Sequence, residues 1–162
     1  MRLGIITFIL ALFIWQCAPA DPSTSVGRDG WLSGTTDEKF ETVTDHFGGF
    51  ARAMVEVQYR YVEMFWAGED ENWDYAAYQL EEMEEALEDG LQRRPARAQS
   101  AQHFMNVVIP EMEEAIASRN KENFDQAFEL FTLQCNSCHA MEQVAFIQVG
   151  PPEKRLGSVR LR

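Results

Sequence analysis

Apolar residues recur every three or four positions in four stretches of the chain, which is the spacing of one face of an α-helix. In the first stretch they are Phe47, Phe50, Met54, Val57, Tyr61 and Met64. The second runs from about Trp73 through Ala76, Leu80 and Met83 to Leu87, the third contains Ala101, Phe104, Val108, Met112 and Ala115 or Ile116, and the fourth contains Phe124, Phe128, Phe131, Cys135 and Cys138. The pattern predicts four amphipathic helices.

Residues that end or bend helices lie between and within these stretches. Gly48-Gly49 weakens the start of the first helix, and Asp89-Gly90 is expected to end the second. Pro110 lies inside the third, which either kinks there or begins there. No segment alternates apolar and polar residues between hairpin turns. Because the connections are short, the predicted fold is all-α, an antiparallel up-down-up-down four-helix bundle.

Residues 1–20 have the layout of a secretory signal, with a basic start, the apolar run LGIITFILALFIW and then small residues. The run is shorter than the roughly 20 residues of a membrane span. Two processing routes remain open, which are cleavage after Ala20 and lipid attachment at Cys17 as in a bacterial lipoprotein. Residues 21–37 would then form a flexible leader. Either route predicts a periplasmic or other extracytoplasmic protein, tethered to the membrane if Cys17 is lipidated.

The formal net charge of −12 limits the class of partner. Nucleic acid is not expected, because its phosphates would be repelled. Most of the acidic residues fall in helical stretches and are interpreted as solvated faces. Residues 144–162 are expected to form a basic tail, in which the last residues, PPEKRLGSVRLR, reverse the sign and are interpreted as loose.

The segment Cys135-Asn136-Ser137-Cys138-His139 is the CxxCH pattern of covalent haem attachment. Each thiol adds across one vinyl group of the haem, and a gap of two residues in a helical turn lets both sulfurs reach the same edge of the macrocycle. His139 then follows as the proximal ligand of the iron. The motif predicts one covalent haem c.

Other uses of these cysteines are weaker. Zinc takes four ligands, and only His46 and His103 could complete a site, in no recognisable pairing. A thioredoxin-like site belongs to an α/β fold. A disulfide between Cys135 and Cys138 would close a very small loop and constrain the unfolded chain little.

The position of this motif, at the end of the last helix in FDQAFELFTLQCNSCH, resembles that in the class II cytochromes c, the cytochrome c′ group. The likeness covers roughly residues 38–143. The block VQYRYVEMFWAGEDENWDYAAYQLEEMEEALEDG also resembles a group of small exported bacterial cytochromes related to that class. The resemblance implies a four-helix haem domain over 38–143 and a homodimer formed through the first two helices. Glu142 and Gln143 stand where that group usually carries a basic residue.

The ligand on the distal side of the iron decides between two functions. The resemblance implies that the first helix covers that side, where Met54, Val57, Tyr61 and Met64 are available. Met54 is the candidate ligand, since it lies near the middle of that helix. A thioether ligand suits one-electron transfer between redox partner proteins. Without one, the iron would be five-coordinate and the protein would bind or sense small gases such as NO or CO.

Arg60 adjoins the apolar face and is a candidate contact for a haem propionate. A salt bridge to Glu56 or Glu63 is the alternative explanation. No His or Arg is placed to act as a distal acid–base group, so an enzyme such as a peroxidase is not expected and no catalytic residue is assigned.

Overall fold

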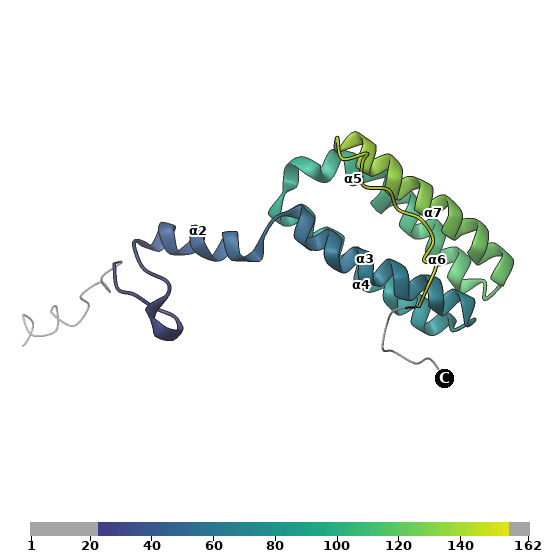
Figure 1. Ribbon diagram of the computed structural model, residues 1–162, viewed down its shortest axis with the longest axis horizontal. Coiled ribbons are helices and arrows are strands. Elements are labelled where there is room, and N and C mark those ends of the chain that lie inside the picture. Colours follow the sequence, from purple (N-terminus) through teal and green to yellow (C-terminus); the bar gives the residue numbers. More distant parts are fainter. Residues whose placement is uncertain (1–22, 156–162) are drawn as a thin grey trace, which may run out of the picture. The chain divides into compact units, whose positions relative to one another are not determined.

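The computed structural model describes residues 23–155 (Figure 1). Within them the chain is mostly helical and has no strand, apart from an isolated bridge between Val26 and Leu32. The all-α prediction is therefore confirmed for the described part of the chain. The predicted secretory signal, including Cys17, lies outside the described residues. No helix between residues 23 and 155 combines the length and the apolar character that a bilayer span requires.

The chain divides into two units, one ending at Phe47 and the other beginning at Gly48. In the first unit, α2 spans Thr36–Phe47. Thr35 and Glu38 cap its start reciprocally, because Glu38 Oε2 accepts from the Thr35 backbone N at 2.7 Å and the Glu38 backbone N donates to Thr35 Oγ1 at 3.3 Å. This helix was not predicted. It takes Phe47, which the sequence pattern had assigned to the first bundle helix, and Gly48 follows it at a φ of +73°.

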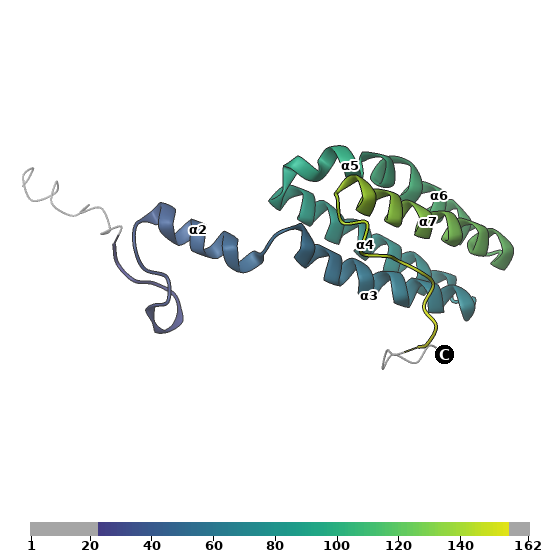
Figure 2. The ribbon, with the colours of Figure 1, turned by 45° about the horizontal axis from the view of Figure 1, so that its top comes forward.

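The second unit contains α3 (Phe50–Glu69), α4 (Trp73–Arg93), α5 (Ala98–His103), α6 (Ile109–Ala117) and α7 (Lys121–Met141). Helix α3 packs along α4, α6 contacts both α4 and α7, and α7 contacts α3 (Figure 2). Side-chain caps fix two of the starts, since Asn72 Oδ1 accepts from the backbone N of Tyr75 and Asn120 Oδ1 from that of Asn123. All four predicted helical stretches are present.

Pro110 is the second residue of α6, and a π-helical turn at Phe104–Val108 joins α5 to α6. Proline has no N–H to donate, and its ring crowds the preceding turn of the helix. The wider π-helical turn before Pro110 accommodates the missing hydrogen bond and the ring. The third predicted helix is therefore interrupted just before the proline.

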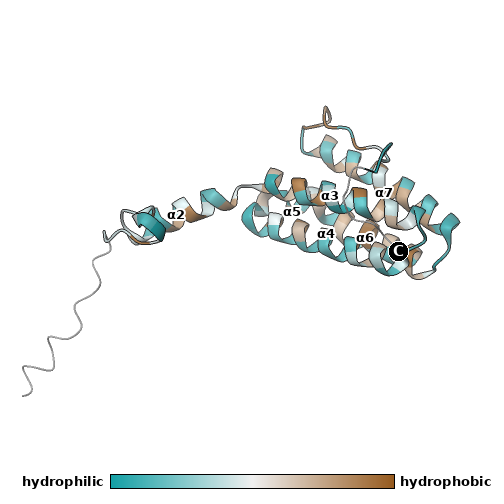
Figure 3. Ribbon diagram, turned by 60° about the horizontal axis from the view of Figure 1, so that its bottom comes forward, coloured by the Kyte–Doolittle hydropathy of each residue, from teal (hydrophilic) through white to brown (hydrophobic). Residues whose placement is uncertain are grey.

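The core lies between α3, α4, α6 and α7, and each of these helices carries both apolar and polar positions (Figure 3). Its fully buried side chains follow the predicted three-four spacing and include Met64, Leu80, Met83, Ile109, Met112, Phe124 and Phe131. The amphipathic pattern thus accounts for the packing of the second unit.

Gly90 lies inside α4 and does not end it, because the helix continues to Arg93. The prediction of a stop at Asp89-Gly90 is therefore wrong. A Cβ atom on Gly90 would lie 2.8 Å from Cβ of Ala53 and 2.9 Å from Cδ2 of Phe50. The glycine is needed for the close approach of α3 and α4, and such a packing role overrides its tendency to terminate helices.

Candidate functional site

A cavity of about 850 Å³ lies between α3, the C-terminal end of α7 and the segment that follows α7. Its size falls within the range of small-molecule and cofactor sites. Four residues singled out in the sequence line it together, namely Met54 from α3 and Cys135, Cys138 and His139 from α7. The fold therefore brings the CxxCH motif and the candidate distal ligand to one cavity.

The two cysteines lie three residues apart on α7, so their side chains share one helix face. Both are free thiols, and both are partly buried. Burial raises the pKa of Cys135 to about 12 and also raises the pKa of Cys138, although the nearby Arg97 guanidinium opposes the second shift. Without a bound group, both thiols are therefore neutral at physiological pH.

His139 has a defined tautomer. Its Nδ1 lies 2.9 Å from the backbone carbonyl oxygen of Ile147, and a carbonyl can only accept. Nδ1 must therefore carry the proton, which leaves the lone pair of Nε2 free to bind a metal. Holding the second ring nitrogen with a carbonyl is the usual way in which proteins orient a ligating histidine.

A capping motif at the end of α7 returns the chain towards His139. Gln143 has a φ of +62°, its N–H donates to the carbonyl of Ala140 at 3.1 Å, and the N–H of Val144 donates to the carbonyl of His139 at 2.9 Å. This is the Schellman arrangement, in which one left-handed residue ends a helix and reverses the chain. Figure 2 shows the segment after α7, in yellow, running back from that end.

The returning segment, residues 144–155, is ordered and contributes Val144, Ile147, Gln148, Val149, Gly150, Pro152, Glu153 and Lys154 to the cavity. Its end is held by Arg155, whose NH2 donates to Asp70 Oδ1 at 2.8 Å and whose guanidinium lies 5.0 Å from the ring centroid of Trp66. These contacts hold residues 144–155 beside α7 and α3, whereas most of the predicted loose stretch, residues 156–162, lies outside the described residues.

On the opposite wall, Met54 is half-buried and is joined by Val57 and Tyr61. Met64, a weaker candidate from the same helix face, is fully buried in the core and does not line the cavity. The Tyr61 hydroxyl donates to Thr132 Oγ1 at 2.8 Å, because the Thr132 hydroxyl itself donates to the carbonyl of Phe128. Met83 of α4, which the sequence pattern gave only as an apolar helix position, also lines the cavity.

Arg60 does not line the cavity. Its NH2 lies 3.0 Å from Glu56 Oε1 and 2.9 Å from Glu82 Oε2, so the salt-bridge explanation describes its position. Arg97 lies at the cavity instead and forms an ion pair with Glu142. His103 is exposed on α5 and His46 belongs to α2, and neither contributes to the cavity.

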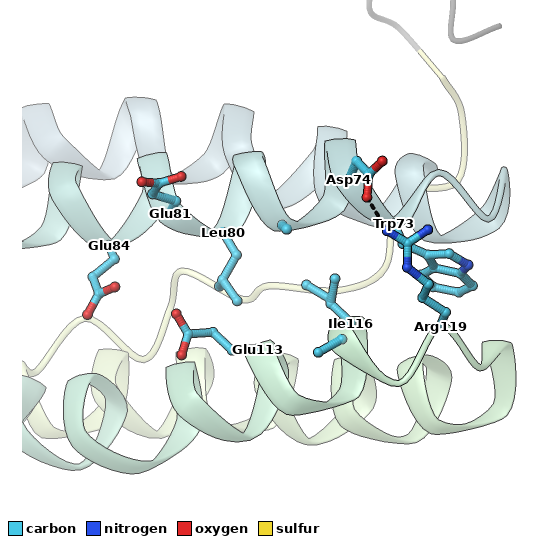
Figure 4. Close-up of a pocket in the computed structure, with 10 residues that line it drawn as sticks. Trp73, Asp74, Leu80, Glu81, Glu84, Glu113, Ile116 and Arg119 are labelled. Carbon is cyan, nitrogen blue, oxygen red and sulfur yellow. Dashed lines mark hydrogen bonds and ion pairs between the residues drawn. The ribbon is translucent and has the colours of Figure 1, made fainter.

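A second cavity, of about 440 Å³, lies between α4 and α6 (Figure 4). Glu81 and Glu84 approach it from α4 and Glu113 from α6, and Arg119 pairs with Asp74 at one end. Burial and the neighbouring carboxylates raise the pKa of Glu84.

Within residues 23–155, no three or more His, Cys, Asp or Glu side chains gather in a group that could hold a bare metal ion. No protein-family model, curated protein or solved structure matches this chain.

Proposed function

We propose that this protein is an exported c-type cytochrome that carries one covalent haem on Cys135, Cys138 and His139 and passes single electrons between extracytoplasmic partner proteins. The observation that carries the proposal is the hydrogen bond from Nδ1 of His139 to the carbonyl of Ile147. It leaves Nε2 of the motif histidine available as an iron ligand, beside two neutral thiols in an apolar cavity.

The residues at the cavity fit a haem in three respects. The cysteines offer two sulfurs on one helix face for thioether bonds, the imidazole offers one nitrogen, and apolar side chains such as Val57 and Phe104 offer contact surface for a macrocycle. A bound haem supplies a one-electron iron couple, and the protein sets its potential through axial ligands, hydrogen bonds and burial.

Met54 is proposed as the distal ligand. In support, it is the methionine of α3 that lines the cavity, on the wall formed by that helix. The thioether sulfur would fill the sixth position and favour the reduced state, as in other cytochromes with a His/Met ligand pair. Arg97 replaces Arg60 as the proposed basic contact for a haem propionate, because Arg97 lies at the cavity.

The proposed topology of the second unit is the antiparallel up-down-up-down bundle of the cytochrome c′ group. The short link between α3 and α4 supports it, since helices joined by so few residues and packed along their length generally run in opposite directions. A homodimer is proposed as well, and the half-exposed Tyr59 on α3 and Tyr78 on α4 provide apolar surface for it. Export, with or without a lipid on Cys17, and the absence of enzymatic activity remain parts of the proposal.

An absorption spectrum of the protein matured with c-haem tests the proposal against gas binding. The expected result is a sharp low-spin spectrum of the reduced protein that carbon monoxide does not change. A broad high-spin spectrum that shifts with carbon monoxide would instead indicate an open sixth position, and would favour gas binding or sensing over electron transfer.

A further inference from the structure

Asn136, the first residue between the two cysteines, forms hydrogen bonds to the returning segment through both the nitrogen and the oxygen of its side-chain amide. Nδ2 of Asn136 donates to the carbonyl of Val149 at 2.9 Å, and the backbone N–H of Val149 donates to Oδ1 of Asn136 at 2.8 Å. Nδ2 also donates to the carbonyl of Thr132 at 3.2 Å. An amide of this length offers a donor and an acceptor side by side, which an alanine or a serine at the same position cannot do.

His139 and Asn136 lie three residues apart on α7 and hold the same segment at two nearby points. Ile147, whose carbonyl accepts from His139, is two residues before Val149. The Asn136 contact therefore fixes the backbone immediately next to the acceptor of the histidine.

Apolar packing alone does not hold the segment at this place. The side chain of Phe146 is 82% exposed and that of Ile147 is 48% exposed, whereas Val149 is partly buried against the core. The segment is anchored on either side, by the Val144 hydrogen bond at the end of α7 and by Arg155 at α3. Between these anchors, the N–H of Ile147 donates to the carbonyl of Val144 at 2.8 Å and closes a turn. The hydrogen bonds to Asn136 and His139 hold this turn against α7, on either side of the Ile147 carbonyl.

We infer that Asn136 is a positioning residue for His139. By holding Val149, Asn136 keeps the Ile147 carbonyl hydrogen-bonded to Nδ1 of His139, and this hydrogen bond sets how strongly Nε2 donates to the iron. The inference rests on the proposed function. A carbonyl that accepts from Nδ1 makes the other nitrogen a stronger donor, which stabilises oxidised iron relative to reduced iron. Loss of that contact therefore raises the reduction potential.

The variant Asn136→Ala tests this inference against the matched control Ser137→Ala. Both substitutions fall between the two cysteines and leave the CxxCH residues unchanged, but Ser137 is exposed at the surface of α7. Haem content is measured first, by mass spectrometry of the matured proteins. The reduction potential is then measured on the haem-loaded fraction, so a lower yield of one variant does not affect the comparison.

The expected result is an upward shift of the potential in Asn136→Ala and no shift in Ser137→Ala. Losing a hydrogen-bond partner of a metal ligand typically has at least a tenfold effect. A tenfold change in the ratio of oxidised to reduced iron corresponds to about 59 mV for one electron. Hydrogen exchange of the backbone amide of Val149 should accelerate in the same variant, because Asn136→Ala removes the oxygen that accepts from it.

Three outcomes would overturn the inference, and they are distinguishable. A wild-type protein without covalent haem would overturn the proposed function and this inference with it. Normal haem content with an unchanged potential in Asn136→Ala would overturn the inference alone, even if Val149 loses protection, because Asn136 would then only stabilise the segment. Equal shifts in both variants would also overturn it, since the effect would not depend on the contact with Val149.

Discussion

Nδ1 of His139 lies 2.9 Å from the carbonyl oxygen of Ile147, eight residues further along the chain. The contact connects the end of α7 to a segment that the hydropathy pattern does not mark as structured. It also fixes which nitrogen of the imidazole is free.

Met54→Ala should convert a low-spin haem protein into one that binds carbon monoxide, because the sixth position loses its thioether. The reduction potential should fall at the same time, since a methionine ligand raises it. Absorption spectra of the reduced protein with and without carbon monoxide measure the change. Met83→Leu is the matched control, because Met83 also lines the cavity but comes from α4. If Met83→Leu opens the sixth position and Met54→Ala does not, the ligand was assigned to the wrong methionine.

Arg97→Gln should lower the reduction potential, whereas Arg60→Gln should leave it unchanged. Removing the guanidinium at the cavity takes away a positive charge that disfavours oxidised iron, and it leaves Glu142 without its ion-pair partner. Because Arg97 is about half exposed, solvent screens the effect, and a shift below about 59 mV is expected. Potentiometric titration of the two variants provides the measurement. A larger shift in Arg60→Gln would contradict the placement of these two residues.

Gly90→Ala should lower the free energy of unfolding by roughly 1–3 kcal/mol, even though alanine favours helices more than glycine does. The added methyl group would meet Cβ of Ala53 at 2.8 Å, and that atom cannot rotate away. Gly150→Ala is the control, since nothing lies within 4 Å of the Cβ atom it would introduce. Urea unfolding of both variants measures the difference, and equal midpoints would show that α3 and α4 are not packed this closely.

The haem-free protein should lose stability as the pH rises from about 8.5 to 10. Burial raises the pKa of Cys135 to about 12 in the folded state, whereas a cysteine of the unfolded chain loses its proton near pH 8.5. The unfolded state therefore binds fewer protons in this range, and the free energy of unfolding falls with pH. Denaturant unfolding at several pH values measures the slope. Cys135→Ala should reduce the slope, and the raised pKa of Cys138 accounts for the part that remains. An unchanged slope in that variant would contradict the burial of the Cys135 thiol.

The sequence was informative where side-chain periodicity determines structure. The spacing of Phe124, Phe128 and Phe131 places the cysteines on the inner face of α7, and the same spacing places Met54 on the inner face of α3. The all-α fold class follows from the same pattern.

Two roles could not be predicted from residue type alone. Gly90 has the identity of a helix terminator, but it serves as a contact point between two helices, which depends on what lies opposite. Arg60 and Arg97 both carry the right charge for a propionate. Arg60 lies on α3 and pairs with Glu56 and Glu82, whereas Arg97 ends a short 3-10 turn, Pro95–Arg97, that lies at the cavity. Helical periodicity describes the first residue but not a connecting turn.

Two segments were missed for different reasons. The start of α2 carries the signal of a capping box at Thr35 and Glu38, which could have predicted it. The segment after α7 has no such signal, because hydrogen bonds from Asn136 and His139 to its backbone hold it in place. Every residue has a backbone carbonyl, so the identities of Ile147 and Val149 do not indicate that their carbonyls accept these hydrogen bonds.

The mass of the matured protein under denaturing conditions shows directly whether haem is covalently bound to this chain. We expect the wild-type chain to retain one haem after unfolding, and the double variant Cys135→Ala, Cys138→Ala to retain none. A wild-type chain without bound haem, expressed beside a control cytochrome that is matured in the same cells, would show that Cys135 and Cys138 do not bind haem.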